Sequence, residues 1–174
     1  MKRKLAFLLA TLGFGVMIFL GYKITTILVF QAAVRKHKTT LPNLDYLASL
    51  DGQKFQRENL PPEKAVILLY CQSDCGFCTG EIEDILDHPS LIADVSLLLV
   101  SSEKDSVLKT FQKKYDLKTY PYIQVLHSPS DDFYQTFGTN VFPSAFVYDR
   151  YRKLLKQYRG QVRANILYQT IESG

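Results

Sequence analysis

Two cysteines separated by two residues, Cys75 and Cys78, form the motif with the clearest chemistry in this chain. They follow a run of apolar residues and precede a segment with helical spacing, so we expect Cys75 at the start of a helix. A helix N-terminus stabilises negative charge, and the thiolate is the form of cysteine that attacks a disulfide. Cys78 would lie one turn further along, where it can attack a mixed disulfide and release the product. The pair therefore predicts thiol–disulfide exchange through a reversible Cys75–Cys78 disulfide.

The residues around this pair bear on substrate and metal binding. Gly76 would let the backbone of a partner approach closely, and we expect Gly76 and Phe77 to contact the substrate. The same cysteine spacing occurs in half of a zinc site, but zinc needs two more ligands, and the chain's only further cysteine is Cys71. Cys71 ends the apolar run, where a free cysteine packs as a small hydrophobic residue. We therefore predict a dithiol site with no metal and no cofactor.

Alternating strands and helices are predicted to position this site. The continuous apolar runs 65–70 and 95–100 fit strands that are buried on both faces. A hairpin-type turn is expected at Asp51-Gly52. Helices are expected over 77–86, 104–115 (with Val107, Leu108, Phe111 and Tyr115 on one face), 130–137 and 162–171, and further strands over 122–126, 144–148 and 153–158. This order predicts an α/β fold with a central mixed sheet flanked by helices.

The positive charge of the chain is concentrated at its N-terminus. Residues before Pro42 hold seven of the 21 Lys and Arg residues and none of the 17 acids, which leaves 14 bases against 17 acids in the remainder. The basic character is therefore a property of the N-terminal segment. This basic segment indicates contact with a membrane surface, and the charge gives no reason to expect that the protein binds nucleic acid.

An apolar segment follows these first basic residues. Leu5 to Tyr22 carry no charge over about 18 residues, which is enough to span a bilayer, and apolar character resumes from Ile24 to Val34. A signal peptide has a shorter apolar core and a small-x-small cleavage site, and we find no convincing site here. We expect residues 1–34 to form an uncleaved anchor that contacts lipid through residues 5–34, followed by a polar tether over 35–42 and a soluble domain over 43–174.

The number of basic residues does not decide the orientation in the membrane. Three basic residues precede the span, and three, Arg35, Lys36 and Lys38, follow it. The cysteine pair favours the oxidising side of the membrane. We therefore expect a single-pass protein of the bacterial inner membrane, with its C-terminal domain facing the periplasm or the outside.

The segment from Leu69 to Glu81 resembles the active-site region of the membrane-anchored TlpA and ResA thioredoxin-like proteins, which have a strand, C-x-x-C and then a Glu three residues after the second cysteine. Further similarities follow in order and cover nearly the whole soluble domain: Leu41-Pro42, Asp51-Gly52, 99–102, 137–146 and 149–160. The resemblance implies a thioredoxin-like fold. It also implies a thiol–disulfide oxidoreductase that acts on protein thiols or disulfides of the cell envelope, with a membrane electron donor or acceptor.

The resemblance also implies residue roles. Cys75 would be the attacking cysteine, Cys78 the resolving one, and Glu81 an acid that assists proton transfer. Pro143 would follow a cis peptide bond and face the disulfide, which would let the backbone of Phe142 pair with an extended substrate. A solvated carboxylate remains the alternative for Glu81, and an ordinary trans proline at the start of a strand remains the alternative for Pro143.

Several features leave other functions open. Asp74 stands where thioredoxins have Trp, and a carboxylate beside a thiolate disfavours the charged form. Cys71 and Cys75 have the C-x-x-x-C spacing of Sco-type copper proteins, for which His127 is the candidate third ligand. The segment Cys78 to Glu81 is faintly similar to the peroxidatic segment of peroxiredoxins, without the upstream Pro and Thr. A redox-inactive tethered binding module is a further alternative.

Overall fold

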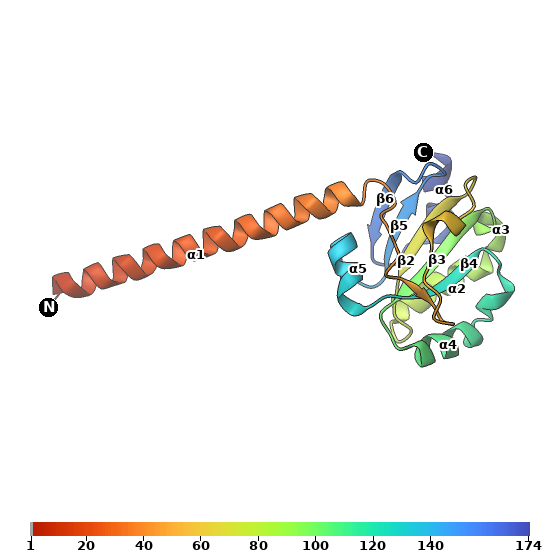
Figure 1. The fold of residues 1–174 in the computed structure, drawn as a ribbon, viewed down its shortest axis with the longest axis horizontal. Helices are drawn as coiled ribbons and strands as arrows, with labels where there is room; N and C mark the ends of the chain where they lie inside the picture. The colour runs from red at the N-terminus through yellow and green to blue at the C-terminus, as the bar shows by residue number, and fades with distance from the viewer. Residues whose placement is uncertain (1) are drawn as a thin grey trace. The chain divides into compact units, whose positions relative to one another are not determined.

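The structure is a computed structural model that describes residues 2–174, with the side chains outside 2–11, 35–37 and 130–131. The chain divides into two compact units with the boundary between residues 36 and 37. The first unit is a single helix, α1 (Lys2–His37), drawn from red to orange in Figure 1. Its segment Leu12–Val34 is long and apolar enough to cross a membrane. By length and composition, this helix is a candidate membrane anchor.

The second unit is built on one six-stranded sheet in the order β1-β4-β3-β2-β5-β6. β2 is parallel to β3, and β3 is parallel to β4, whereas β5 is antiparallel to β2, β6 to β5 and β1 to β4. In Figure 1 the sheet runs through the middle of this unit, from β6 at one edge to β4 beside α4. The strands are β1 (Ala48–Ser49), β2 (Ala65–Tyr70), β3 (Val95–Ser101), β4 (Ile123–His127), β5 (Ser144–Tyr148) and β6 (Leu154–Arg159).

Helices cover both faces of this sheet and create two apolar cores. One core contains side chains of α2, α4 and α6 together with Cys71 and Cys78. The other contains side chains of α5 and of the segment before β2. The helices are α2 (Gly76–Asp87), α3 (Pro89–Ile92), α4 (Asp105–Lys114), α5 (Ser130–Phe137) and α6 (Ala164–Glu172), with 3-10 turns at Arg57–Asn59 and Leu117–Thr119. The expected α/β fold with a mixed sheet between helices is confirmed.

The strand burial follows from this arrangement. All residues of β2 and β3 are buried, as continuous apolar runs predict for strands covered on both faces. β6, at the edge, has four half-buried and two exposed positions and none that is fully buried. The short strand β1 lies directly before the predicted turn at Asp51-Gly52, whereas the short helix α3 was not predicted, because four residues are too few to show a period.

The segment between α1 and the sheet differs from the expected polar tether over 35–42. Helix α1 continues to His37, and the compact unit begins there rather than at residue 43. Thr39 C=O accepts a hydrogen bond from Leu154 N–H (2.8 Å), and Leu41 N–H donates to Arg152 C=O (2.7 Å). Leu41 is also buried. Polar composition suggested a free tether, but backbone pairing with the β5–β6 hairpin makes these residues part of the folded unit.

Candidate functional site

Cys75 lies where the sequence predicted it, as the N-cap residue of α2. It has extended backbone angles, and its Sγ accepts a hydrogen bond from Cys78 N–H at 3.4 Å. Cys75 is half-buried, and all three cysteines of the chain are free thiols. A sulfur that accepts an N–H in the first turn of a helix is placed to carry negative charge. This geometry suits a thiolate nucleophile that can reach a partner.

Cys78 has the opposite environment, because it is fully buried. Burial raises the pKa of the Cys78 thiol to about 12, and the hydrogen bond with Cys75 and the charges of Cys75 and Glu81 act in the same direction. Gln72 N–H lies 3.5 Å from Cys78 Sγ and lowers this pKa, but by less than burial raises it. The two thiols are thus unequal. Cys75 is accessible, and Cys78 stays protonated at neutral pH until a base takes its proton.

Glu81 is the group on α2 that is suited to exchange this proton. It is fully buried, its Oε2 accepts a hydrogen bond from Val162 N–H at 3.2 Å, and its Oε1 has no hydrogen-bond partner among the described residues. Burial raises the pKa of Glu81 to about 8, with a smaller contribution from the Asp84 charge, against the opposing effect of the Val162 bond. The alternative of a solvated carboxylate is therefore wrong for Glu81. A carboxyl group that titrates near neutral pH suits general acid–base catalysis.

A second carboxylate on α2 was missed by the sequence reasoning. Asp84, one turn after Glu81, accepts a hydrogen bond from Ala164 N–H at 2.7 Å, at the first residue of α6. The acids therefore hold the segment before α6 against α2 at two points. Their three-residue spacing was the available signal, because residues three apart share one face of a helix.

Pro143 follows a cis peptide bond with Phe142, as predicted. Tyr70 pairs with Ser144 in the antiparallel β2–β5 register, so Pro143 lies at the level of Cys71, where β2 gives way to the loop that carries Cys75. The Phe142 ring lies 4.6 Å from the Tyr70 ring and packs against the core that contains Cys78. Contact of Pro143 with the sulfurs stays a prediction.

Glu103 is another residue that the sequence reasoning did not single out. Its carboxylate accepts hydrogen bonds from Ser73 N–H (2.7 Å), from Ser73 Oγ–H (2.6 Å) and from Ser101 Oγ–H (3.2 Å). The loop that precedes Cys75 is thereby fixed to the end of β3. Thirty residues separate Glu103 from Ser73, so no local pattern in the sequence indicates this contact.

We expect Glu103→Ala to destabilise the protein by about 1–3 kcal/mol, because Ser73 loses a charged acceptor for two donors. Chemical denaturation of the full chain measures this change. Glu83→Ala is the matched control, since its carboxylate accepts one exposed bond, from Tyr115 Oη–H, and we expect an effect within about 0.5 kcal/mol. Equal losses in the two variants would show that Glu103 does not anchor the loop.

The copper alternative gains no support from the arrangement of its three candidate ligands. Cys71 is buried, and burial raises the pKa of its thiol well above the usual value. His127 lies on β4, two strands from β2, and its Nδ1 is 3.5 Å from Asp105 Oδ1. Within residues 2–174, no group of three or more His, Cys, Asp or Glu side chains is placed to hold a metal.

A peroxiredoxin-like function is also inconsistent with the environment of the cysteines. It would use Cys78, whose burial and raised pKa are the reverse of what a reactive thiolate needs.

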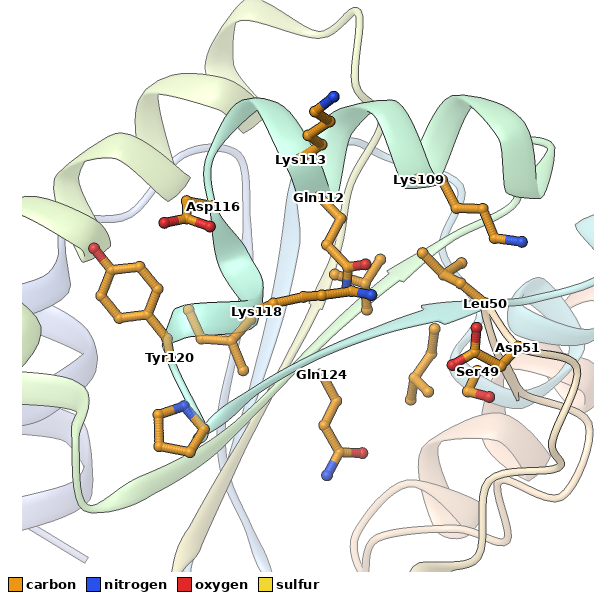
Figure 2. A pocket seen from close by; sticks show the side chains of 14 residues that line it. Ser49, Leu50, Asp51, Lys109, Gln112, Lys113, Asp116, Lys118, Tyr120 and Gln124 are labelled. Carbon is orange, nitrogen blue, oxygen red and sulfur yellow. The ribbon is translucent and has the colours of Figure 1, made fainter.

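A cavity of about 790 Å³ lies away from the cysteines, between α4, β4 and the turn after β1. Figure 2 shows Gln112, Lys118 and Gln124 among the side chains around it. None of Cys71, Cys75 and Cys78 lines this cavity. Its size alone therefore does not identify the reactive site, and the chemistry resides at the start of α2.

Comparison with known proteins identifies the family of this chain. The model of the AhpC/TSA family matches residues 37–158. The search of curated proteins found no match.

Among solved structures, the exposed lipoprotein thioredoxin Etrx1 of Streptococcus pneumoniae is similar with a TM-score of 0.57 and 23% identity, over 74% of this chain and 97% of that chain. DsbF of Mycobacterium tuberculosis is similar with a TM-score of 0.61 and 21% identity, over 75% and 95%. StoA of Bacillus subtilis is similar with a TM-score of 0.55 and 17% identity, over 74% and 98%. At these identities the likeness shows the thioredoxin-like fold.

Proposed function

Because this chain belongs to the AhpC/TSA family of thioredoxin-fold proteins, we propose that it is a membrane-anchored thiol–disulfide oxidoreductase that exchanges disulfides with envelope proteins through Cys75 and Cys78. The observation that carries the proposal is the inequality of the two thiols. Cys75 is half-buried at a helix N-terminus, whereas Cys78 is fully buried and protonated beside Glu81. This is the arrangement that a two-step exchange needs.

In the first step, the Cys75 thiolate attacks one sulfur of a substrate disulfide. The substrate S–S bond breaks, a mixed disulfide forms with Cys75, and the other substrate sulfur leaves as a thiolate that takes a proton from water. In the second step, Cys78 gives its proton to the Glu81 carboxylate and attacks the sulfur of Cys75. The second substrate sulfur leaves as a thiolate and takes the proton that Glu81 received from Cys78. The substrate is thus released as a dithiol and the Cys75–Cys78 pair becomes a disulfide, so two electrons pass to the substrate. The reverse sequence oxidises a substrate dithiol.

The proposed location rests on α1. Leu12–Val34 has the length and composition of a membrane span, and basic residues flank it. We propose that residues 5–34 contact lipid, that the second unit faces the periplasm or the outside, and that a membrane protein supplies or accepts the electrons. Similar proteins described as an exposed lipoprotein and as secreted support this location. The acidic balance of residues after 41 gives no reason to expect nucleic acid.

A redox titration of the full-length protein tests the proposed activity. In glutathione buffers of stepped potential, we expect a two-electron transition between dithiol and disulfide in the parent and in Cys71→Ala, because Cys71 packs in the core. Cys75→Ala should show no such transition. A transition lost equally in Cys71→Ala would point to a three-thiol site, and its absence from the parent would favour the redox-inactive binding module.

A further inference from the structure

A shallow apolar groove lies directly beside the loop that carries the reactive cysteine. Its volume is about 410 Å³. Ser73, two residues before Cys75, forms one wall, and the other lining residues belong to α4. The lining residues are Ser73, Ser106, Val107, Thr110, Phe111 and Lys114.

Val107 gives this groove its apolar character at the surface. The sequence pattern assigned Val107 to the same helix face as Leu108 and Phe111. The structure buries Leu108 and Phe111 to 2% and 6% exposure but leaves Val107 at 39%. An apolar side chain that the fold does not cover, in a groove that the buried Phe111 also lines, offers a surface for another apolar group.

The groove has a fixed wall on the side of the cysteines. Ser73 is bound through its N–H and its hydroxyl group to the Glu103 carboxylate. These bonds attach Ser73 to the end of β3, so this wall of the groove keeps its position relative to the sheet. A preorganised wall lowers the entropy lost when a partner binds.

We infer that this groove binds an apolar side chain of the substrate, two or three positions from the substrate's reactive cysteine. The inference rests on the proposed function and specifies its substrate class. The mixed disulfide holds the substrate sulfur at Cys75, and an extended chain covers about 3.3–3.6 Å per residue, so such a side chain is within reach of Ser73 and Val107. The covalent link makes this contact intramolecular, and a shallow groove is then sufficient.

Exchange with two peptides tests the inference. The substrates are disulfide-linked peptides that carry Leu or Asn two positions from the cysteine, and each rate is divided by the same protein's rate with the small disulfide 5,5′-dithiobis(2-nitrobenzoate). We expect the full-length parent to react about tenfold faster with the Leu peptide than with the Asn peptide. A ratio of this size corresponds to the free energy of burying part of a Leu side chain. Val107→Asp should reduce the preference to about twofold or less. The control Ile166→Asp replaces a similarly exposed side chain on α6 (37% exposed) and should keep the preference.

Three other outcomes would contradict the groove, the substrate assignment or the proposed function. A preference unchanged in Val107→Asp overturns the groove, while the exchange activity stands. Self-association of the parent that Val107→Asp abolishes, with no effect on peptide preference, assigns the groove to a second copy of the chain and overturns the substrate assignment. No reaction of the parent with any disulfide overturns the proposed function itself.

Discussion

Cys78→Ser should accumulate long-lived mixed disulfides with substrates, whereas Cys75→Ser should lose exchange almost completely. Burial raises the pKa of the Cys78 thiol to about 12, so this thiol stays protonated at pH 7 and Cys78 cannot replace Cys75 as the attacking group. Cys78 is also fully buried and unreachable for a partner protein. Without Cys78, in contrast, the first step proceeds and the second has no nucleophile.

Alkylation and mass spectrometry measure both effects. The reduced full-length protein is treated with less than one equivalent of iodoacetamide, and we expect the label on Cys75. Non-reducing electrophoresis then follows the mixed disulfides of Cys78→Ser with a disulfide-bonded protein. Cys71→Ser serves as the control and should behave like the parent, since Cys71 is a buried member of the core. Preferential label on Cys78, or no mixed disulfide with Cys78→Ser, would refute the assigned roles.

Glu81 should make the protein less stable as pH rises from about 4.5 to 8. In the unfolded chain this carboxyl group loses its proton near 4.5, whereas burial raises its pKa to about 8 in the folded protein. Between these values the folded state holds one proton more, so the free energy of unfolding falls with rising pH and levels off above 8. At about 1.4 kcal/mol per pH unit, the full loss is at most about 5 kcal/mol.

The measurement is the difference in unfolding free energy between the parent and Glu81→Gln at several pH values. We expect Glu81→Gln to gain stability relative to the parent by several kcal/mol between pH 5 and pH 8. Glu83→Gln on the same helix is the control, and its difference from the parent should stay constant over this range because Glu83 is exposed. A Glu81→Gln difference that does not change with pH would mean that Glu81 is already ionised in the folded protein.

Much of this fold could be predicted from the sequence, because its strands and helices have strong periods. The apolar run 65–70 is β2 itself, and the expected helix over 130–137 is α5. The position of Cys75 at the start of a helix follows from the change of period at that point.

The contacts that tune the site could not be predicted, because they join distant segments. Glu103 reaches Ser73 across 30 residues, and Glu81 reaches Val162 across 81. The burial of Glu81, on which its raised pKa depends, requires the packed C-terminal segment to be known. Composition also misled at residues 39–41, because the polar Thr39 and the buried Leu41 both pair through their backbone groups with residues 152–154.

The position of β2 in the sheet has a consequence for the redox cycle. All six residues of β2 are buried, and β2 pairs with β3 on one edge and with β5 on the other. Central strands of this kind open only with the whole domain, whereas loops and edges open locally at low free energy. The reactive loop is attached to the part of the domain that should exchange its amide hydrogens most slowly. The start of the reactive loop can therefore keep its position in the sheet over many turnovers, while the bond between the two sulfurs forms and breaks.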